Sequence, residues 1–291
     1  MSAFTLKLIA LAAMILDHMS VAMPETFDFG YRVIGRLAFP LFVFLVAEGF
    51  AHTKSRMKFL TRLFAFAIIS QPFFGWALHG AAMPGEVSFV AHTNIYYTLF
   101  LGGLAVTWYA FLHEIMKKYE SVIACNYNDA LSPISDRFLM LLRFNGQHSG
   151  MRTRVVLEMA VMGGYKLGFM LFIYGPMVGF AWIAHLLNTD YGAYGVVFIF
   201  TAYWMRERNR VIKLTTFALL SLWQFRWLFN GAIEFGFAAF EPIVWLMIPA
   251  TLVSTVLIAF YNGRRGLGMK WLFYIAYPAH LAVLAAFVTF L

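Results

Sequence analysis

Nine stretches of the sequence are almost entirely apolar, and polar connections separate them. Most of these stretches approach the roughly 20 residues that an α-helix needs to cross a lipid bilayer. We therefore predict an all-α fold, a polytopic transmembrane helical bundle of about nine spans (nine to ten). The predicted spans are residues 4–21, 33–52, 59–79, 93–112, 167–187, 191–205, 214–230, 242–261 and 271–291.

Two regions between the spans need separate interpretation. Residues 154–187 are rich in glycine and longer than one span requires, so a second short span or an interfacial helix remains an alternative there. The only long polar connection, at about residues 113–156, is predicted to be a cytoplasmic loop with one amphipathic helix on the membrane surface. The whole chain, 1–291, is predicted to form a single domain.

Lysine and arginine are concentrated in alternate connections, which predicts the orientation of the chain. Cytoplasmic connections of membrane proteins carry an excess of these residues. The pattern predicts a cytoplasmic N-terminus and an outer C-terminus, with Arg32 and Arg36 as exceptions on the outer side. The basic connections contain Lys54, Arg56 and Lys58, then Lys117, Lys118, Arg137, Arg143, Arg152 and Arg154, then Arg206, Arg208, Arg210 and Lys213, and finally Arg264, Arg265 and Lys270.

Composition supports a membrane protein and argues against other classes. The chain of 291 residues is 62% hydrophobic and 12% charged, whereas soluble domains carry about 25% charged residues. Its net charge of +8 lies mainly in the connections, so topology explains it better than nucleic-acid binding, for which no motif is present. The single Cys125 excludes an internal disulfide and shows no metal-ligand spacing.

The second predicted span carries residues that an ordinary lipid-facing anchor lacks. Near its start are Arg36 and Pro40, and it closes with Glu48 and His52. Proline has no N–H, so Pro40 leaves the carbonyl of Arg36 without its helical partner. A charge at the centre of the membrane costs about 2.5 to 3.5 kcal/mol on insertion scales, so Glu48 is expected to face protein or water and to have a partner.

Further polar residues lie at the outer ends of other spans. Asp17 and His18 end the first predicted span, Asn94 opens the fourth and Asp190 precedes the sixth. Adjacent residues point about 100° apart on a helix, so Asp17 and His18 need not touch.

The last predicted span holds Tyr277 and His280 at mid-depth, and Pro278 between them frees the carbonyl of Tyr274. A lone histidine near a helix end is more often a packed residue than a catalyst. Irregular backbone at membrane depth, however, is tolerated where it is buried in protein or lines a cavity. Ionisable groups beside helix-breaking prolines in two spans therefore favour an internal polar site.

Six segments carry a family resemblance: LKLIALAAMILDHMS, GRLAFPLFVFLVAEGFAHTKSR, KFLTRLFAFAIISQPFF, TNIYYTLFLG, DYGAYG and KWLFYIAYPAHLAVL. In this order and approximate spacing they resemble the TraX family, whose named member acetylates the N-terminus of F-pilin. The resemblance covers most of the chain outside residues 113–154, where the polar loop is longer than expected of the family.

The family is more distantly similar to transmembrane acyltransferases, which take acetyl from cytoplasmic acetyl-CoA and deliver it to an acceptor across the membrane. By that resemblance Asp17 and His18 match the Asp-His pair, and residues 36–40 match a Gly-Arg-Ala-Phe-Pro-like block. Asn94 matches the fourth-span Asn and His280 the last-span Tyr-Pro-x-His block. The resemblance implies a multi-pass protein of the bacterial inner (cytoplasmic) membrane with acetyl-CoA as co-substrate.

The implied reaction transfers acetyl to an amine or hydroxyl acceptor, such as a pilin-like N-terminus or a glycan. It needs a general base with a pKa near the operating pH, and histidine is the natural side chain. We assign the base to His18, with Asp17 or else Asp190 orienting its ring or stabilising its imidazolium. The predicted donors to the developing oxyanion are Arg36, Asn94, Tyr277 and His280.

The donor's binding site is predicted at the cytoplasmic end, where basic loops suit the phosphates of acetyl-CoA. The pantetheine arm would thread the bundle toward His18, and no metal is required. The predicted cofactor-binding residues are Glu48, His52, Arg56, Arg264 and Arg265.

Other functions remain as alternatives. A transferase that acetylates a sugar hydroxyl or amine of a surface glycan or lipid would use the same residues. A proton-coupled membrane transporter would use Asp17, Glu48, His52 and His280 as a relay, although the sequence lacks the inverted repeat of paired broken segments typical of many transporters. A structural membrane protein is disfavoured by the number of intramembrane ionisable groups. The predicted partners are acetyl-CoA, a peptide amine or glycan acceptor and the lipid bilayer, without nucleic acid.

Overall fold

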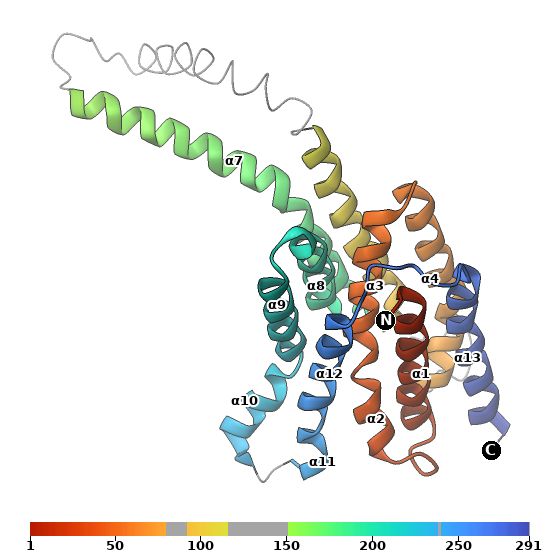
Figure 1. The fold of residues 1–291 in the computed structure, drawn as a ribbon. Coiled ribbons are helices and arrows are strands. Elements are labelled where there is room, and N and C mark those ends of the chain that lie inside the picture. Colours follow the sequence, from red (N-terminus) through yellow and green to blue (C-terminus); the bar gives the residue numbers. More distant parts are fainter. Residues whose placement is uncertain (80–91, 116–150, 238–239, 291) are drawn as a thin grey trace. The chain divides into compact units, whose positions relative to one another are not determined.

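A computed structural model describes residues 1–79, 92–115, 151–237 and 240–290 (Figure 1). These residues form helices and no strand, and one isolated bridge joins Thr93 to Thr189. The all-α prediction is therefore confirmed for the described part of the chain. Each predicted span overlaps at least one helix, and the spans at 33–52, 214–230 and 242–261 are each divided between two helices. Six helical segments are long and apolar enough to cross a membrane. This marks a membrane protein, while nine spans and the orientation of the termini stay predictions.

The first three helices build one end of the site. Helix α1 (Ala3–Ala22) begins after Ser2, whose Oγ accepts a hydrogen bond from the Thr5 N–H, and Asp28 caps α2 (Phe29–Gly35) in the same way through the Gly30 N–H. Helix α3 (Ala38–His52) follows after a break at residues 36–37. The second predicted span is thus interrupted beside Arg36, which directs this side chain toward α1.

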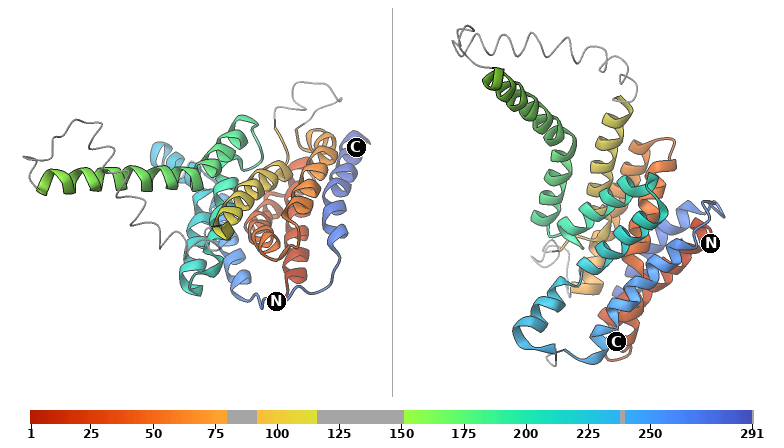
Figure 2. Two further views of the ribbon diagram at one scale, coloured as in Figure 1. Left: turned by 90° about the horizontal axis from the view of Figure 1, so that it is seen from above. Right: turned by 60° about the vertical axis from the view of Figure 1, so that its left-hand side comes forward.

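Helix α3 lies at the centre of its unit. It packs against α1, α8 (Gly192–Trp204) and α12 (Met247–Ala259). Helix α4 (Arg56–His79) packs along α13 (Lys270–Phe290), and both views in Figure 2 keep α13 beside α1 and α4. The remaining short elements are η1 (Met205–Glu207), α9 (Arg210–Trp223), α10 (Arg226–Phe235) and α11 (Pro242–Trp245).

The backbone ties the start of α1 to the connection before α13. The N–H groups of Ala3 and Phe4 donate to the carbonyls of Arg264 and Arg265 at 2.9 and 3.1 Å. The first N–H groups of a helix have no partner within the helix, so these carbonyls satisfy two of them.

Two prolines leave carbonyls unpaired, and other helices satisfy both. The Arg36 carbonyl, freed by Pro40, accepts a hydrogen bond from Thr251 Oγ1 on α12 at 3.2 Å. The Tyr274 carbonyl, freed by Pro278, accepts a long hydrogen bond from Tyr96 Oη at 3.5 Å. Both backbone predictions from sequence are therefore confirmed.

The chain divides into two compact units. One comprises residues 1–106 and 180–291, and the other comprises residues 107–179; the predicted single domain stays a prediction. The helix Ile95–Ile115 and α7 (Met151–Leu186) contribute residues to both units. Helix α7 is continuous, so the region 154–187 holds one helix, without the second short span considered from sequence. The amphipathic helix predicted within residues 113–156 falls largely outside the described residues.

Candidate functional site

A cavity of about 260 Å³ lies in the first unit, where the end of α1, the break between α2 and α3 and the start of α8 meet. Its walls combine charged groups with aromatic and aliphatic side chains. Such a mixture is typical of ligand sites, in which a few polar groups orient a ligand inside an otherwise apolar cavity. The lining residues are Met14, Asp17, His18, Val21, Arg32, Gly35, Arg36, Ala38, Phe39, Phe42, Phe74, Leu78, Ile95, Asp190, Tyr191 and Tyr277.

His18 faces this cavity and is held by His280. The ring nitrogens His18 Nδ1 and His280 Nε2 lie 2.7 Å apart, and the two rings stack with centroids 5.0 Å apart. His280 Nδ1 lies 2.9 Å from the carbonyl of Ala276, which only accepts, so this nitrogen carries a proton. In the neutral pair His280 Nε2 is then an acceptor, and His18 must donate from Nδ1. The second nitrogen of His18, Nε2, is left with its lone pair.

Asp17 does not interact with the partner of the adjacent His18; it forms an ion pair with Arg36. Its Oδ1 lies 2.5 Å from Arg36 Nη2, and Arg36 Nε donates to the carbonyl of Arg32 at 3.3 Å. Gly35 permits this approach, because a Cβ there would come within 2.3 Å of the Asp17 Cβ. The side chain that hydrogen-bonds to the His18 ring is therefore His280, and the carboxylate of Asp17 fixes the guanidinium of Arg36.

Tyr277 lines the same wall of the cavity. Its side chain is 3% exposed, and its oxygen is buried with no hydrogen-bond partner among the described residues. An unused buried hydroxyl is costly unless a ligand or water completes it. The ring packs edge-on against His18 at a centroid distance of 6.2 Å, so Tyr277 lies beside the base candidate.

The connection between α7 and α8 brings Asp190 and Tyr191 to the cavity. The Asp190 N–H donates to the Thr93 carbonyl at 2.8 Å, and Thr98 Oγ1 donates to the Asp190 carbonyl. Tyr191 adopts a left-handed conformation (φ 63°) and stacks on Phe39 with ring centroids 3.5 Å apart. A non-glycine residue in this region is uncommon, and here it directs the Tyr191 ring against α3.

Asp190 supplies a carboxylate whose charge changes near neutral pH. Burial, reinforced by the nearby charge of Asp17, raises the pKa of the Asp190 carboxyl to about 7. Its carboxylate accepts a hydrogen bond from the backbone N–H of Tyr191. The structure records no salt bridge to Asp190 among the described residues, in contrast to Asp17.

Asn94 lies in the interior of the bundle and is not among the residues that line the cavity. Its Nδ2 donates to the carbonyl of Ala67 and to Gln71 Oε1 at 2.8 and 2.9 Å, and its Oδ1 accepts from the Tyr96 N–H at 3.0 Å. Both amide hydrogens are therefore in use. The geometry gives Asn94 a scaffold role as the cap of the helix Ile95–Ile115, and its assignment as an oxyanion donor stays a prediction.

The predicted cofactor residues lie at the opposite end of the helices. The exposed His52 and the largely buried Glu48 form a pair, with His52 Nδ1 3.7 Å from Glu48 Oε2. Arg56 begins α4, and Arg264 and Arg265 lie in the exposed connection before α13. None of the five lines the cavity around His18, so a donor that reached from these loops to the base would have to cross the bundle.

Sequence reasoning missed the pairing of His18 with His280 and the role of Gln71. No local pattern reveals a contact between the first and last helices. Gln71 gave a signal that was overlooked: an amide inside an apolar helix is costly unless it is paired, and its Oε1 accepts from both the N–H and the Nδ2 of Asn94.

The cavity thus combines a histidine nitrogen able to accept a proton, an unused hydroxyl, a fixed guanidinium and a second carboxylate. A base beside oxyanion donors is the arrangement that acyl transfer requires. The same groups are able to bind an amine or a hydroxyl.

Comparison with known proteins relates this chain to a family. The probable fimbrial assembly protein FimC, serogroup H1, of Dichelobacter nodosus is 28% identical over 300 residues, covering 100% of this chain and 97% of that protein. No solved structure matches the chain significantly. A model described as TraX protein matches residues 2–162 and 155–288. Because these matches together extend over nearly the whole sequence, the chain belongs to the TraX family.

Proposed function

We propose that this protein is an integral-membrane acetyltransferase that acts on a fimbrial or pilus subunit. It transfers acetyl from acetyl-CoA to the N-terminal amine of that subunit, and His18 acts as the general base. Family membership and the fimbrial name of the relative support a role in pilin processing. The residues of the cavity support the finer assignment to acetyl transfer.

One observation carries this proposal: the hydrogen-bond chain from His18 through His280 to the Ala276 carbonyl. The chain fixes the tautomer of His18 and leaves Nε2 as a proton acceptor in the cavity wall. When Nε2 takes a proton, the Nδ1–H bond to His280 stabilises the imidazolium and holds the ring in place. His280 therefore performs the orienting task that a carboxylate performs in many catalytic triads.

The reaction follows from these positions. The acceptor nitrogen attacks the thioester carbonyl while His18 Nε2 accepts the proton that the nitrogen loses. The carbonyl oxygen gains negative charge, and we assign its stabilisation to Tyr277 and Arg36, which both line the cavity. Collapse of the tetrahedral intermediate breaks the carbon–sulfur bond, and the proton on His18 passes to the leaving thiolate. The products are an N-acetylated acceptor and free CoA.

Asp190 favours an amine over a hydroxyl acceptor. A carboxylate beside the cavity attracts an ammonium group and has no comparable advantage for a neutral sugar hydroxyl. Asp17 is already paired with Arg36, which leaves Asp190 for the acceptor. An amine that binds as an ammonium first gives one proton to the Asp190 carboxylate or to water, and His18 then takes the second proton as the neutral amine attacks.

The proposal is tested by incubating the purified protein, in lipid nanodiscs, with acetyl-CoA and a synthetic peptide that carries a pilin N-terminus. Release of CoA thiol and the gain of one acetyl group by mass spectrometry measure transfer. The control peptide has a blocked N-terminus. His18→Ala is expected to lower the turnover rate by roughly 10²- to 10⁴-fold, the usual contribution of a general base.

His185→Ala is the matched control variant, because His185 is exposed on α7 and is not among the cavity's lining residues. It should retain the wild-type rate. Equal rates for His18→Ala and wild type would remove His18 as the base. Failure of the wild type to acetylate any free amine would remove the acetyltransferase assignment.

A further inference from the structure

Arg32 lines the cavity around His18 and has no role in the reaction described above. It lies in the last turn of α2 and is partly exposed. Among the residues that the structure describes, its guanidinium makes no hydrogen bond and no ion pair. A charged group that is partly withdrawn from water loses hydration that a partner has to replace. The Arg32 side chain is therefore available to a ligand that enters the cavity.

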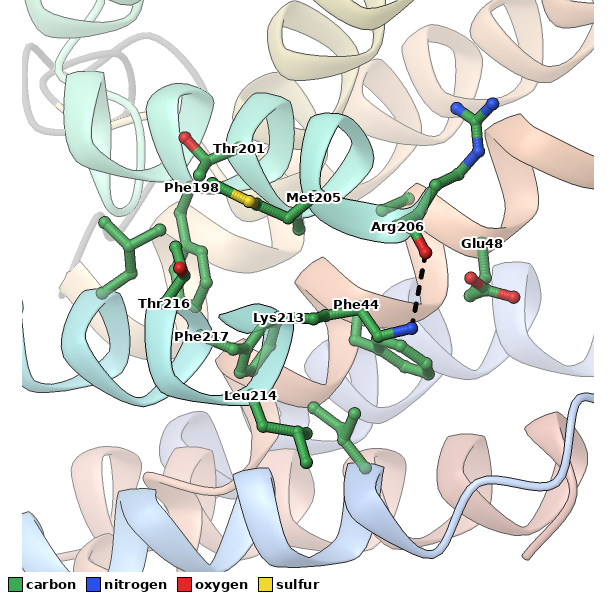
Figure 3. Close-up of a pocket in the computed structure, with 14 residues that line it drawn as sticks. Phe44, Glu48, Phe198, Thr201, Met205, Arg206, Lys213, Leu214, Thr216 and Phe217 are labelled. Carbon is green, nitrogen blue, oxygen red and sulfur yellow. Dashed lines mark hydrogen bonds between the residues drawn. The ribbon is translucent and has the colours of Figure 1, made fainter. Parts of the chain in front are cut away.

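An arginine at the other end of the first unit shows the opposite case (Figure 3). Arg206, in η1, borders a pocket of only about 20 Å³, which is room for about one water molecule. Its Nη2 lies 2.6 Å from Glu207 Oε1, and its carbonyl accepts a hydrogen bond from Lys213 Nζ at 3.4 Å. These charges are used within the protein, so this pocket lacks the free cation that the cavity has.

The cavity contains two carboxylates and two guanidinium groups. Asp17 and Arg36 form an ion pair, which leaves Arg32 and Asp190 as one group of each sign. These two do not contact each other, but their charges interact across the cavity. Burial raises the pKa of the Asp190 carboxyl to about 7, and the Arg36 and Arg32 guanidinium groups oppose this rise. A ligand that uses both Arg32 and Asp190 needs a cation close to an oxygen acceptor.

The two arginines of the cavity lie at different depths. Residues four apart share one face of a helix, and at 1.5 Å per residue they are about 6 Å apart along its axis. Arg36 adjoins the break before α3, whereas Arg32 lies one turn closer to the connection between α1 and α2. The predicted orientation places that connection on the outer side. Arg36 is therefore the deeper donor, and Arg32 lies on the side from which an outer acceptor enters.

We propose that Arg32 determines the choice of acceptor by binding the first backbone carbonyl of a peptide whose N-terminal ammonium is bound by Asp190. The inference rests on the proposed function and concerns the acceptor of the same reaction. Arg32 donates hydrogen bonds to the carbonyl oxygen and takes no part in proton transfer. The two residues together recognise a primary amine with a carbonyl one carbon away, which is the chemistry of a polypeptide N-terminus.

The charges of the cavity favour this acceptor over other amines and over hydroxyls. A lysine side chain has an ammonium group but no carbonyl close to it, so it would use Asp190 and leave Arg32 without a partner. A neutral sugar hydroxyl would use neither charge fully. The guanidinium group presents a rigid fork of donors, and a carbonyl oxygen has two lone pairs to accept them.

The size of the cavity agrees with the end of a chain as its occupant. Its volume of about 260 Å³ is close to the lower limit of ligand sites, which usually measure about 300 to 1,000 Å³. Such a space suits one terminal residue and the acetyl thioester and excludes a folded segment. The rest of the acceptor would remain outside the cavity.

Two synthetic acceptors test the inference with the intact protein and acetyl-CoA, in nanodiscs that contain phosphatidylethanolamine. One peptide has a free α-amine. The other has the same sequence extended by a 6-aminohexanoyl group, so several methylene groups separate its amine from the nearest carbonyl. Arg32→Gln should lower kcat/KM for the first peptide by about 10- to 100-fold, the loss expected for a hydrogen bond to a charged group, and should leave the second unchanged. Each peptide is compared with itself in two proteins, so the different basicities of the two amines cancel.

Three further variants separate the role of Arg32 from general effects. Arg226→Gln is the matched control, because Arg226 is an exposed arginine that does not line the cavity; it should change neither peptide. Arg32→Lys keeps the charge but not the fork of donors, so it should lower kcat/KM for the first peptide alone, by less than Arg32→Gln does. It also replaces Arg32→Gln if that variant does not fold. Asp190→Asn should lower kcat/KM for both peptides, because both present an ammonium group.

The outcomes distinguish this inference from the proposed function. Wild-type protein that acetylates neither peptide would overturn both. Wild-type protein that acetylates the first peptide, while the Arg32 variants affect both peptides equally or neither, would overturn only the role of Arg32. Acetylated phosphatidylethanolamine in place of acetylated peptide, found by mass spectrometry of the nanodisc lipid, would assign Arg32 to a phosphate and overturn the peptide acceptor.

Discussion

Asp17 Oδ1 lies 2.5 Å from Arg36 Nη2, so the carboxylate next to the candidate base in α1 is paired with a residue at the end of α2. The two residues are adjacent to the break between α2 and α3, and both side chains are more than four-fifths buried. The pair therefore joins α1 to α2 and positions a cation in the cavity wall. Its loss is expected to affect structure before chemistry.

Removal of one partner of this ion pair should destabilise the protein. Breaking a buried pair typically costs about 3 to 5 kcal/mol, because an unpaired charge remains; Asp17→Asn should therefore lower the melting temperature markedly in nanodiscs. The double variant Asp17→Asn, Arg36→Met should recover much of the loss. A double variant no more stable than Asp17→Asn alone would show that the pair is not the source of the effect.

The close approach of α1 to α2 predicts the effect of a single methyl group. Gly35→Ala places a Cβ within 2.3 Å of the Asp17 Cβ, and such overpacking typically costs about 1 to 3 kcal/mol. Thermal unfolding of the purified protein measures this loss. Gly179→Ala is the control, since nothing lies within 4 Å of a Cβ there, and it should be neutral or stabilising.

His280 is predicted to be a positioning residue. His280→Phe keeps a ring of similar size but removes the acceptor of the His18 Nδ1 proton. Turnover should fall by about 10- to 100-fold, by analogy with other groups that orient a catalytic or ligating histidine, while the affinity for acetyl-CoA stays unchanged. His280→Gln, which retains an acceptor, should recover part of the rate. An unchanged rate in His280→Phe would exclude this role.

The affinity for an amine acceptor should depend on pH through Asp190. Because the pKa of this carboxyl is raised to about 7, Asp190 is neutral below that pH and charged above it. The KM for a peptide with a free N-terminus should therefore fall as the pH rises from 6 to 8. Asp190→Asn should remove this dependence of KM. A dependence that persists in the variant would assign it to another group.

A substitution of Asn94 distinguishes a structural role from a catalytic one. Asn94→Ala loses three side-chain hydrogen bonds in the interior, and the Gln71 amide oxygen keeps only the backbone N–H of residue 94 as donor, so stability should fall by about 1 to 3 kcal/mol. The turnover number per folded molecule should stay near wild type. A turnover number reduced 100-fold in a normally stable variant would instead restore Asn94 as an oxyanion donor.

The approximate positions of the helices were predictable from the sequence, because a membrane-crossing helix is recognised from one continuous stretch of apolar residues. The sequence also predicted that Pro40 and Pro278 free specific carbonyls, since proline lacks an N–H wherever it lies. The residues that donate hydrogen bonds to these two carbonyls, Thr251 and Tyr96, were not predictable. They depend on which helix packs beside the break and on how that helix is rotated.

The site was only partly predictable for the same reason. His18, Asp17, Arg36 and Tyr277 were identified as costly polar residues, and the structure brings them to one cavity. Their pairing was not determined by spacing: adjacent residues on α1 take partners from two different helices. Asn94 was identified in the same way, but its side chain hydrogen-bonds to buried backbone and amide groups and does not line the cavity.

The contact between His18 and His280 joins residues 262 positions apart in the chain. During synthesis, α1 is made long before α13, so the candidate base has no orienting partner until the final described helix has been inserted. A partly made chain would hold His18 without its acceptor and would transfer acetyl poorly. The proposed activity would thereby be tied to the completion of the chain's own insertion, and a chain that stalls before α13 would be inactive even if every earlier helix were correctly placed.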